Sequence, residues 1–216
     1  MKIGTIGAGL MSEALAAQWV KAGHEVLVGG RTPAKAHEIA DRIGARPGTL
    51  REAAEFGDAV LFAVRREGME LSLKEAGAPE GTLAGKPVID CGNAVNLADY
   101  SRITWDGLSM SEELARLAPG SHVVKAFNMA HFKVWQLTPP AFGGAPFVVP
   151  FAGDEAAKPA ARTLISALGC DPLDIGDLTQ THHLEAAAII VIRQLFAGAD
   201  PHTVFALLGN GSAARR

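Results

Sequence analysis

The sequence opens with Lys2-Ile3-Gly4-Thr5-Ile6-Gly7-Ala8-Gly9-Leu10-Met11-Ser12, a short β-branched run that leads directly into a glycine-rich turn. We expect residues 2–6 to form a buried strand and the Ala- and Leu-rich segment from Leu10 to about Lys21 to form a helix. A second strand is expected from Glu25 to Gly29. A strand, a glycine turn, a helix and a strand in this order predict a βαβ unit with a phosphate-binding turn.

Each small residue of the turn has a physical reason. Gly7 allows the tight turn from strand to helix, and Gly9 lets the backbone approach a pyrophosphate closely. The third position of the motif is normally Gly or Ala, and here it is Ser12, which is also small. Free N–H groups at the start of the helix, near Leu10, would bind phosphate. The turn therefore predicts dinucleotide binding, and the alternative is that its glycines serve backbone geometry alone.

The end of the second strand indicates which dinucleotide is bound. It ends in Gly29-Gly30-Arg31-Thr32-Pro33-Ala34-Lys35 and lacks the Asp or Glu that usually binds the ribose 2′-hydroxyl of NAD. Thr32 is expected to be the N-cap of the next helix, and Pro33 its first residue. Lys35 would then oppose the helix dipole unless a phosphate lies nearby. The segment favours NADP(H), with a solvated basic patch as the alternative.

Composition limits the class of protein. The chain has 216 residues, of which 48% are hydrophobic and 20% charged, so it can form a sizeable core. A formal net charge of -3 gives no reason to expect nucleic-acid or acidic-membrane partners. Cys91 and Cys170 lie far apart, which suggests reduced thiols. We expect a cytoplasmic protein with a small-molecule substrate, since neither a signal peptide nor an apolar run of the ~20 residues that span a membrane is evident.

Short β-branched runs alternate with helical patterns, which predicts an α/β fold of Rossmann type with a doubly wound, mostly parallel sheet. Residues 1–216 are expected to form one domain: residues 1–130 as the dinucleotide-binding core, and residues 131–216 as a small C-terminal α/β extension that completes the cleft. Further strands are expected near 45–46 and at 58–64, 87–91, 122–127, 147–151 and 171–175, with helices at 50–56, from Ala157 to Leu168 and at about 179–196. Because the strand at 147–151 contains Pro150, we expect it at an edge of the sheet.

Ligands of doubly wound sheets bind beyond the carboxyl ends of the strands. We therefore expect the segments after three of the strands, at 64–65, 92–93 and 128–130, to share one rim of the cleft. Asn93 could instead make an Asx turn, and Arg65 could belong to a solvated helix start. The candidate cofactor-binding residues are Gly7, Ala8, Gly9, Leu10, Met11, Gly30, Arg31, Thr32, Lys35, Ala63, Val64, Arg65, Gly92, Asn93, Asn128, Met129 and Ala130.

Motifs for metal or nucleophilic catalysis are missing: the sequence has no HExxH, CxxC or nucleophile-elbow pattern. His182 and His183 are adjacent, and adjacent helical side chains point about 100° apart, so no metal site is predicted. His131 is the candidate acid or base of the cleft, with a structural or solvated role as the alternative. The lack of an evident acid–base pair fits hydride transfer, in which cofactors carry the chemistry.

The final helix is apolar nearly all round between Ala186 and Ile192. Such a helix is expected to be buried, in the core or against another subunit. We therefore predict a homodimer that uses this helix. The alternative is a monomer in which the chain's own loop, such as 133–146, covers the second face.

Several stretches together resemble one known family. They are the opening glycine turn, Gly29 to Ala36, Val123-Val124-Lys125-Ala126-Phe127-Asn128, and Ala152-Gly153-Asp154-Glu155 through Asp174-Ile175-Gly176-Asp177-Leu178. They look like the NADPH-dependent reductases of the deazaflavin coenzyme F-420. The resemblance implies a Rossmann core with a C-terminal extension, a homodimer, and hydride transfer between NADP(H) and the deazaflavin.

The resemblance also implies roles for particular residues. The family's Ser/Thr-Arg phosphate clamp maps onto 30–32, where Gly30 replaces the usual Ser, and Lys35 is a further cation. Residues 128–131 fall where the nicotinamide and deazaflavin meet. The Lys-Ala-Phe-Asn sequence at 125–128 is similar to that of the cytosolic domain of membrane metalloreductases. A flavin, a metal or another small molecule is therefore a further acceptor class, and a non-catalytic NADP(H)-binding redox sensor is the alternative function.

Overall fold

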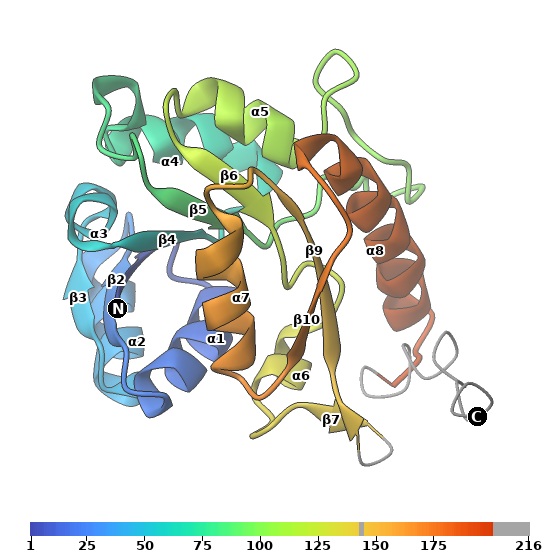
Figure 1. Cartoon of the computed structure of the whole chain (residues 1–216), viewed down its shortest axis with the longest axis horizontal. Helices are drawn as coiled ribbons and strands as arrows, with labels where there is room; N and C mark the ends of the chain where they lie inside the picture. Colours follow the sequence, from blue (N-terminus) through green and yellow to red (C-terminus); the bar gives the residue numbers. More distant parts are fainter. Residues whose placement is uncertain (143–144, 201–216) are drawn as a thin grey trace.

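The computed structural model describes residues 1–142 and 145–200 of the chain. Its centre is an eight-stranded sheet in the order β10-β9-β6-β5-β4-β1-β2-β3 (Figure 1). The strands are β1 (Lys2–Ile6), β2 (Glu25–Gly29), β3 (Arg46–Gly48), β4 (Ala59–Phe62), β5 (Pro87–Asp90), β6 (His122–Lys125), β9 (Val148–Gly153) and β10 (Asp171–Asp174); β7 (Ala141–Phe142) and β8 (Ala145–Pro146) pair separately. The six strands from β1 to β6 run parallel, and β9 is antiparallel to β6.

Helices lie on both faces of this sheet (Figure 1). They are α1 (Leu10–Lys21), α2 (Pro33–Ile43), α3 (Leu50–Phe56), α4 (Met69–Glu75), α5 (Met110–Leu117), α6 (Phe132–Trp135), α7 (Lys158–Ser166) and α8 (Thr181–Phe196), with 3-10 turns η1 (Arg66–Gly68), η2 (Ala78–Glu80) and η3 (Leu178–Gln180). One core contains side chains of α1, α2, α6 and α7, and the other contains side chains of α3, α4 and α5. The predicted doubly wound, mostly parallel fold is confirmed.

The central strands explain the two cores. Successive side chains of a strand point to opposite faces, so a strand covered on both faces is apolar throughout. In β4, Leu61 packs in the first core, whereas Val60 and Phe62 pack in the second. Capping boxes start two of the outer helices: Thr49 with Glu52 at α3, and Ser109 with Glu112 at α5.

The prediction of an edge strand at 147–151 is wrong. Strand β9 lies inside the sheet between β6 and β10, and β10 is the edge. The reason Pro150 is tolerated is local: β6 pairs only with Ala152 and Gly153, beyond the proline. The missing N–H of Pro150 therefore does not interrupt that ladder.

The final helix begins at Thr181, after η3, and it is buried on one face only. Leu184, Ala188 and Val191 are buried, whereas Ile190 is 58% exposed. One face therefore packs on the chain's own core, and the expectation that a second subunit covers the other face stays a prediction. The described part of loop 133–146 does not cover Ile190.

Candidate functional site

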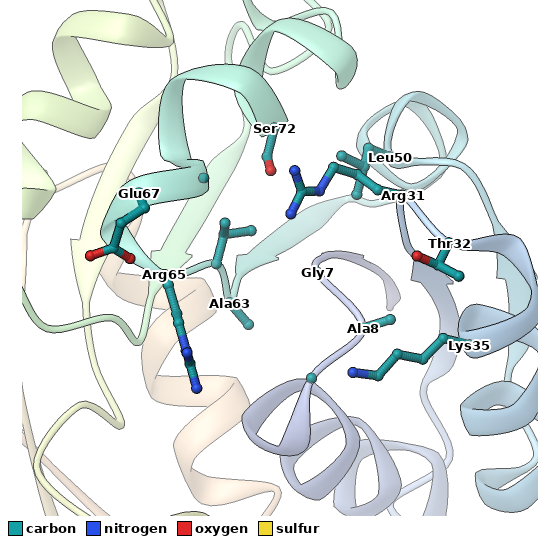
Figure 2. A pocket seen from close by; sticks show the side chains of 13 residues that line it. Gly7, Ala8, Arg31, Thr32, Lys35, Leu50, Ala63, Arg65, Glu67 and Ser72 are labelled. Atoms are coloured by element: carbon teal, nitrogen blue, oxygen red, sulfur yellow. The ribbon is translucent and has the colours of Figure 1, made fainter.

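A cavity of about 470 Å³ lies at the carboxyl ends of β1, β2 and β4 (Figure 2). Nine of the expected residues line it: Gly7, Ala8, Gly9, Arg31, Thr32, Lys35, Ala63, Val64 and Arg65. Leu50, Glu67, Gly68 and Ser72 also line it and were not predicted. Leu50 begins α3 and the other three belong to η1 and α4, so their place in the wall follows from how these elements pack.

The glycine turn forms the floor of this first cavity. Gly7 has φ +117, and a Cβ there would lie 2.5 Å from the carbonyl oxygen of Ala63. Glycine is therefore required at this position by both conformation and space. Gly9 differs, because a Cβ at this N-cap of α1 would meet nothing within 4 Å. No side chain caps α1, so its N-terminus faces open space that an anion could fill.

Basic side chains reach into the first cavity from both sides. Figure 2 shows Arg31 and Lys35 on the side of α2 and Arg65 on the opposite wall. None of these three cations has an ion-pair or hydrogen-bond partner among residues 1–142 and 145–200. Thr32 is the N-cap of α2, as predicted, but its side chain makes no capping hydrogen bond. This arrangement suits an anionic ligand, because the cations have no acid of the described chain to neutralise them.

Three expected residues lie outside the walls of the cavities described here. Gly30 is buried, and a Cβ there would lie 3.1 Å from Ala8 Cβ and 3.2 Å from Ala36 Cβ. Leu10 is the first residue of α1 and is 57% exposed. Gly92 accepts a hydrogen bond from Lys125 Nζ through its carbonyl oxygen, at 2.8 Å.

A second cavity of about 190 Å³ lies between the start of α1, the segment after β6, and α8. The expected residues Met11, Asn93, Asn128, Met129, Ala130 and His131 line it, together with Phe132, Ala188, Val191, Ile192 and Leu195. Of these, His131 is the one titratable residue. The four residues of α8 were missed as site residues, although the apolar character of that helix was noted. The cavity presents a mostly apolar wall with a few amide groups.

Hydrogen bonds of two asparagines connect the segments that form the second cavity. Asn93 Nδ2 donates to the carbonyl oxygen of Asn128 at 2.8 Å, and Asn128 Nδ2 donates to Asn93 Oδ1 at 2.9 Å. Asn128 Nδ2 also donates to the carbonyl oxygen of Leu184 at 3.1 Å. The bonds of Asn93 therefore reach across to the segment after β6 instead of closing a local Asx turn. They join the end of β5, the end of β6 and α8.

A buried charge cluster lies beneath this asparagine pair. Lys125 Nζ is 2.6 Å from Asp90 Oδ2 and 3.2 Å from Glu185 Oε1, and all three residues are at most 1% exposed. Burial alone would lower the pKa of Lys125, but the attraction of Asp90 and Glu185 outweighs it and raises that pKa. Desolvation raises the pKa of Glu185, with a further increase from the charge of Asp90. The cluster fixes Gly92, because Lys125 binds its carbonyl oxygen and Asp90 Oδ1 accepts its N–H.

His131 occupies a structural position in the wall. It is the N-cap of α6, where Nδ1 accepts a hydrogen bond from the N–H of Lys133 at 3.4 Å. Its ring centroid lies 4.2 Å from that of Phe132. These contacts support a structural role for His131, the alternative to its role as an acid or base. The ring still lines the second cavity.

A third cavity of about 610 Å³ continues from the other two. It shares Arg65 and Glu67 with the first cavity and Asn93 with the second. Its remaining lining residues are Arg66, Val95, Asn96, Leu97 and Ile103. The segments after β4, β5 and β6 thus form one continuous rim, as the strand order requires.

The described residues also lack the arrangement that a metal site requires. The described ranges 1–142 and 145–200 contain no group of three His, Cys, Asp or Glu side chains placed to hold a metal ion. His182 instead contacts Glu112 at 2.7 Å and Arg102 at 2.6 Å. No helix within those ranges is long and apolar enough to cross a membrane.

Comparison with known proteins shows similarity to one family of oxidoreductases. Residues 2–94 match the family model of the coenzyme F420-dependent NADP oxidoreductases. The crystal structure of a candidate F420-dependent NADP reductase from Arthrobacter sp. FB24 is 26% identical, with a TM-score of 0.80, and covers 94% of this chain and 96% of that one. The family resemblance inferred from the sequence is confirmed.

Other similar proteins differ in length. The metalloreductase STEAP3 of Rattus norvegicus is 30% identical over 187 residues, which is 86% of this chain and 36% of the relative. The chain thus spans about a third of that protein. A reductive aminase from Aspergillus terreus in complex with NADPH is 23% identical with a TM-score of 0.67, covering 96% of this chain and 70% of that one, and it shares the fold. The family model and the solved reductase structure support an NADP-dependent oxidoreductase.

Proposed function

The chain is related to the coenzyme F420-dependent NADP oxidoreductases, and we propose that it transfers hydride between NADP(H) and a planar conjugated acceptor, a deazaflavin (coenzyme F-420) or a flavin. One observation carries the proposal. Three cations without a partner in the described chain line the same cavity as the open N-terminus of α1, and the third cavity links that cavity to a mostly apolar one through the shared residues Arg65, Glu67 and Asn93.

Each part of the nucleotide has a matching set of residues in this proposal. The backbone at Gly7 to Gly9 and the N-terminus of α1 would bind the pyrophosphate. Arg31, Thr32 and Lys35 would bind the 2′-phosphate through charge-assisted hydrogen bonds. The open space above Gly9 supports the fit, because a side chain there would occupy the place of the phosphates.

The residues of the second cavity would bind and orient the two reacting rings. NADPH, when bound, would supply a hydride, with both electrons, to the acceptor, and solvent would supply the proton that completes the reduced acceptor. The asparagine pair fixes the position of the cavity floor, and the apolar residues of α8 exclude water. Positioning of this kind supplies most of the rate in a reaction that needs no nucleophile.

A metal acceptor is a second candidate. It is favoured by the 30% identity to a metalloreductase over 86% of this chain.

We further propose a single cytoplasmic domain that forms a homodimer. Residues 1–130 would bind the dinucleotide and residues 131–216 would complete the cleft. The exposed apolar face of α8, which includes Ile190 and Phe196, favours self-association. Cys91 and Cys170 are free and buried, in keeping with a reducing compartment.

The test is NADPH oxidation followed by absorbance, with a deazaflavin, FMN, riboflavin and ferric citrate as acceptors and with NADH in parallel. We expect turnover with NADPH and a flavin-type acceptor. Turnover with ferric citrate alone would favour the metal reductase. Tight NADPH binding without oxidation by any acceptor would show a non-catalytic module and refute the proposed activity.

A further inference from the structure

The third cavity contains an arginine with an unsatisfied donor. The Nε atom of Arg66 is buried and has no hydrogen-bond partner in the described part of the chain. An unsatisfied buried donor costs free energy, and the cost is larger for a charged group. Arg66 lines this cavity of about 610 Å³, so a ligand could reach it. We propose that the cavity binds an anionic substituent, a phosphate or carboxylate, of the hydride acceptor, and that Arg66 determines this specificity.

The charges of the cavity favour an anion. Its charged lining residues are Arg65, Arg66 and Glu67, which sum to one positive charge. Glu67 Oε1 lies 3.0 Å from Arg66 Nη2, but the Glu67 side chain is 64% exposed. Exposed ion pairs of this kind contribute little and are screened by solvent. A ligand oxyanion could therefore replace Glu67 at Arg66, whose side chain is 35% exposed, and a small rotation of the guanidinium would let the buried Nε donate to the same ligand.

The position of the third cavity suggests that its ligand is part of the hydride acceptor. It shares Asn93 with the second cavity, where the reacting rings would meet in the function proposed above, on which this inference rests. Val95, Leu97 and Ile103 give its remaining wall an apolar character. An acceptor with its ring near Asn93 and an anionic tail at Arg66 would fit such a cavity.

The wall of the cavity is built before any ligand binds. Val95 and Arg102 form a β-bridge, and the N–H of Asn96 donates to the carbonyl oxygen of Ser101 at 2.9 Å. Arg102 in turn contacts His182 of α8 at 2.6 Å. This loop is thus tied to the same helix that forms the wall of the second cavity.

The nucleotide is the other possible source of the anion, and the lining residues separate the two. Arg65 lines both the first and the third cavity, whereas Arg66 lines only the third of the three cavities described. A nucleotide in the first cavity would therefore be sensitive to Arg65, and an acceptor in the third cavity would be sensitive to Arg66.

FMN and riboflavin test the inference, because they share one ring system and differ by a phosphate. Each is titrated by calorimetry into protein saturated with NADP⁺, so the readout is binding and not turnover. The wild type should bind FMN at least tenfold more tightly than riboflavin, the scale of one charge-assisted hydrogen bond. Arg66→Gln should bring the two affinities to within about twofold of each other. It should do so by weakening FMN binding and leaving riboflavin binding unchanged. Glu67→Gln, which removes the competing carboxylate, should increase it.

Three results would overturn the inference: equal affinities of FMN and riboflavin for the wild type, an unchanged ratio in Arg66→Gln, or no binding of either flavin. NADPH titrations without flavin provide the control, and Arg66→Gln should leave that dissociation constant within about twofold. If NADPH and FMN lost affinity equally, the anion would be that of the nucleotide and the inference would be wrong. Failure of the proposed function would appear in a different experiment, the acceptor panel, as a lack of NADPH oxidation with every acceptor.

Discussion

Replacing Lys125 by Met should destabilise the fold strongly. Met has a similar length but no charge, so the buried carboxylates of Asp90 and Glu185 would lose their shared cation. The carbonyl oxygen of Gly92 would lose its donor as well. Removing one partner of a buried ion pair costs about 3–5 kcal/mol, because the remaining charge stays buried without compensation.

This cost can be measured as a shift in melting temperature. For a chain of this size, each kcal/mol corresponds to ~2–4 °C, so the melting temperature of Lys125→Met should fall by ~6–20 °C near pH 8. Thermal unfolding followed by circular dichroism measures it. Lys86→Met is the matched control, since Lys86 Nζ binds two backbone carbonyl oxygens of α3 and no buried carboxylate. The melting temperature of Lys86→Met should fall much less than that of Lys125→Met.

The pH dependence has a definite sign. The pKa of Glu185 is raised, so the stability from its bound proton is present below the ordinary value of about 4.3 and is lost as pH rises through the raised value. Without Lys125 that pKa should rise further. The difference in melting temperature between wild type and variant should therefore shrink from pH 8 to pH 5. A variant that melts within about 2 °C of the wild type at pH 8 would refute the reasoning.

Three further predictions concern the site and its surroundings. Gly9→Val should fold normally, because a Cβ there meets nothing within 4 Å, yet weaken NADPH binding at least tenfold, as titration would measure; unchanged affinity would place the phosphates elsewhere. His131→Ala should lower turnover less than about a hundredfold, the scale at which general acid–base contributions begin, and a larger loss would make His131 the acid or base. Light scattering should give a dimer of twice 22.5 kDa for the wild type and a folded monomer for Ile190→Glu, while a monomeric wild type would exclude the dimer.

Local sequence patterns predicted most residues that line the first cavity. The turn at Gly7 and Gly9 and the cap at Thr32 with Pro33 are short-range features, so the sequence alone places them. Nine expected residues line the first cavity for this reason. The short helices α4 and α5 were not anticipated, since seven or eight residues give a weak periodic pattern.

Local sequence patterns could not predict contacts between residues that lie far apart in the sequence. The Lys125–Asp90–Glu185 cluster joins positions up to 95 residues apart, since 185 minus 90 is 95, and no spacing rule connects them. The position of β9 inside the sheet depends on a partner strand, β10, whose pairing the sequence does not state. The part played by α8 in the second cavity likewise follows from tertiary packing.

The most direct test of the account is the ratio of the dissociation constants of NADH and NADPH, measured by calorimetry for the wild type and Arg31→Ala. Charge-assisted hydrogen bonds contribute roughly 1.5–3 kcal/mol, so the wild type should prefer NADPH by a factor of about ten or more. Arg31→Ala should lower that preference by weakening NADPH alone, and part of the preference should remain because Lys35 also lines the cavity. Equal affinities of the wild type for NADH and NADPH would contradict the account.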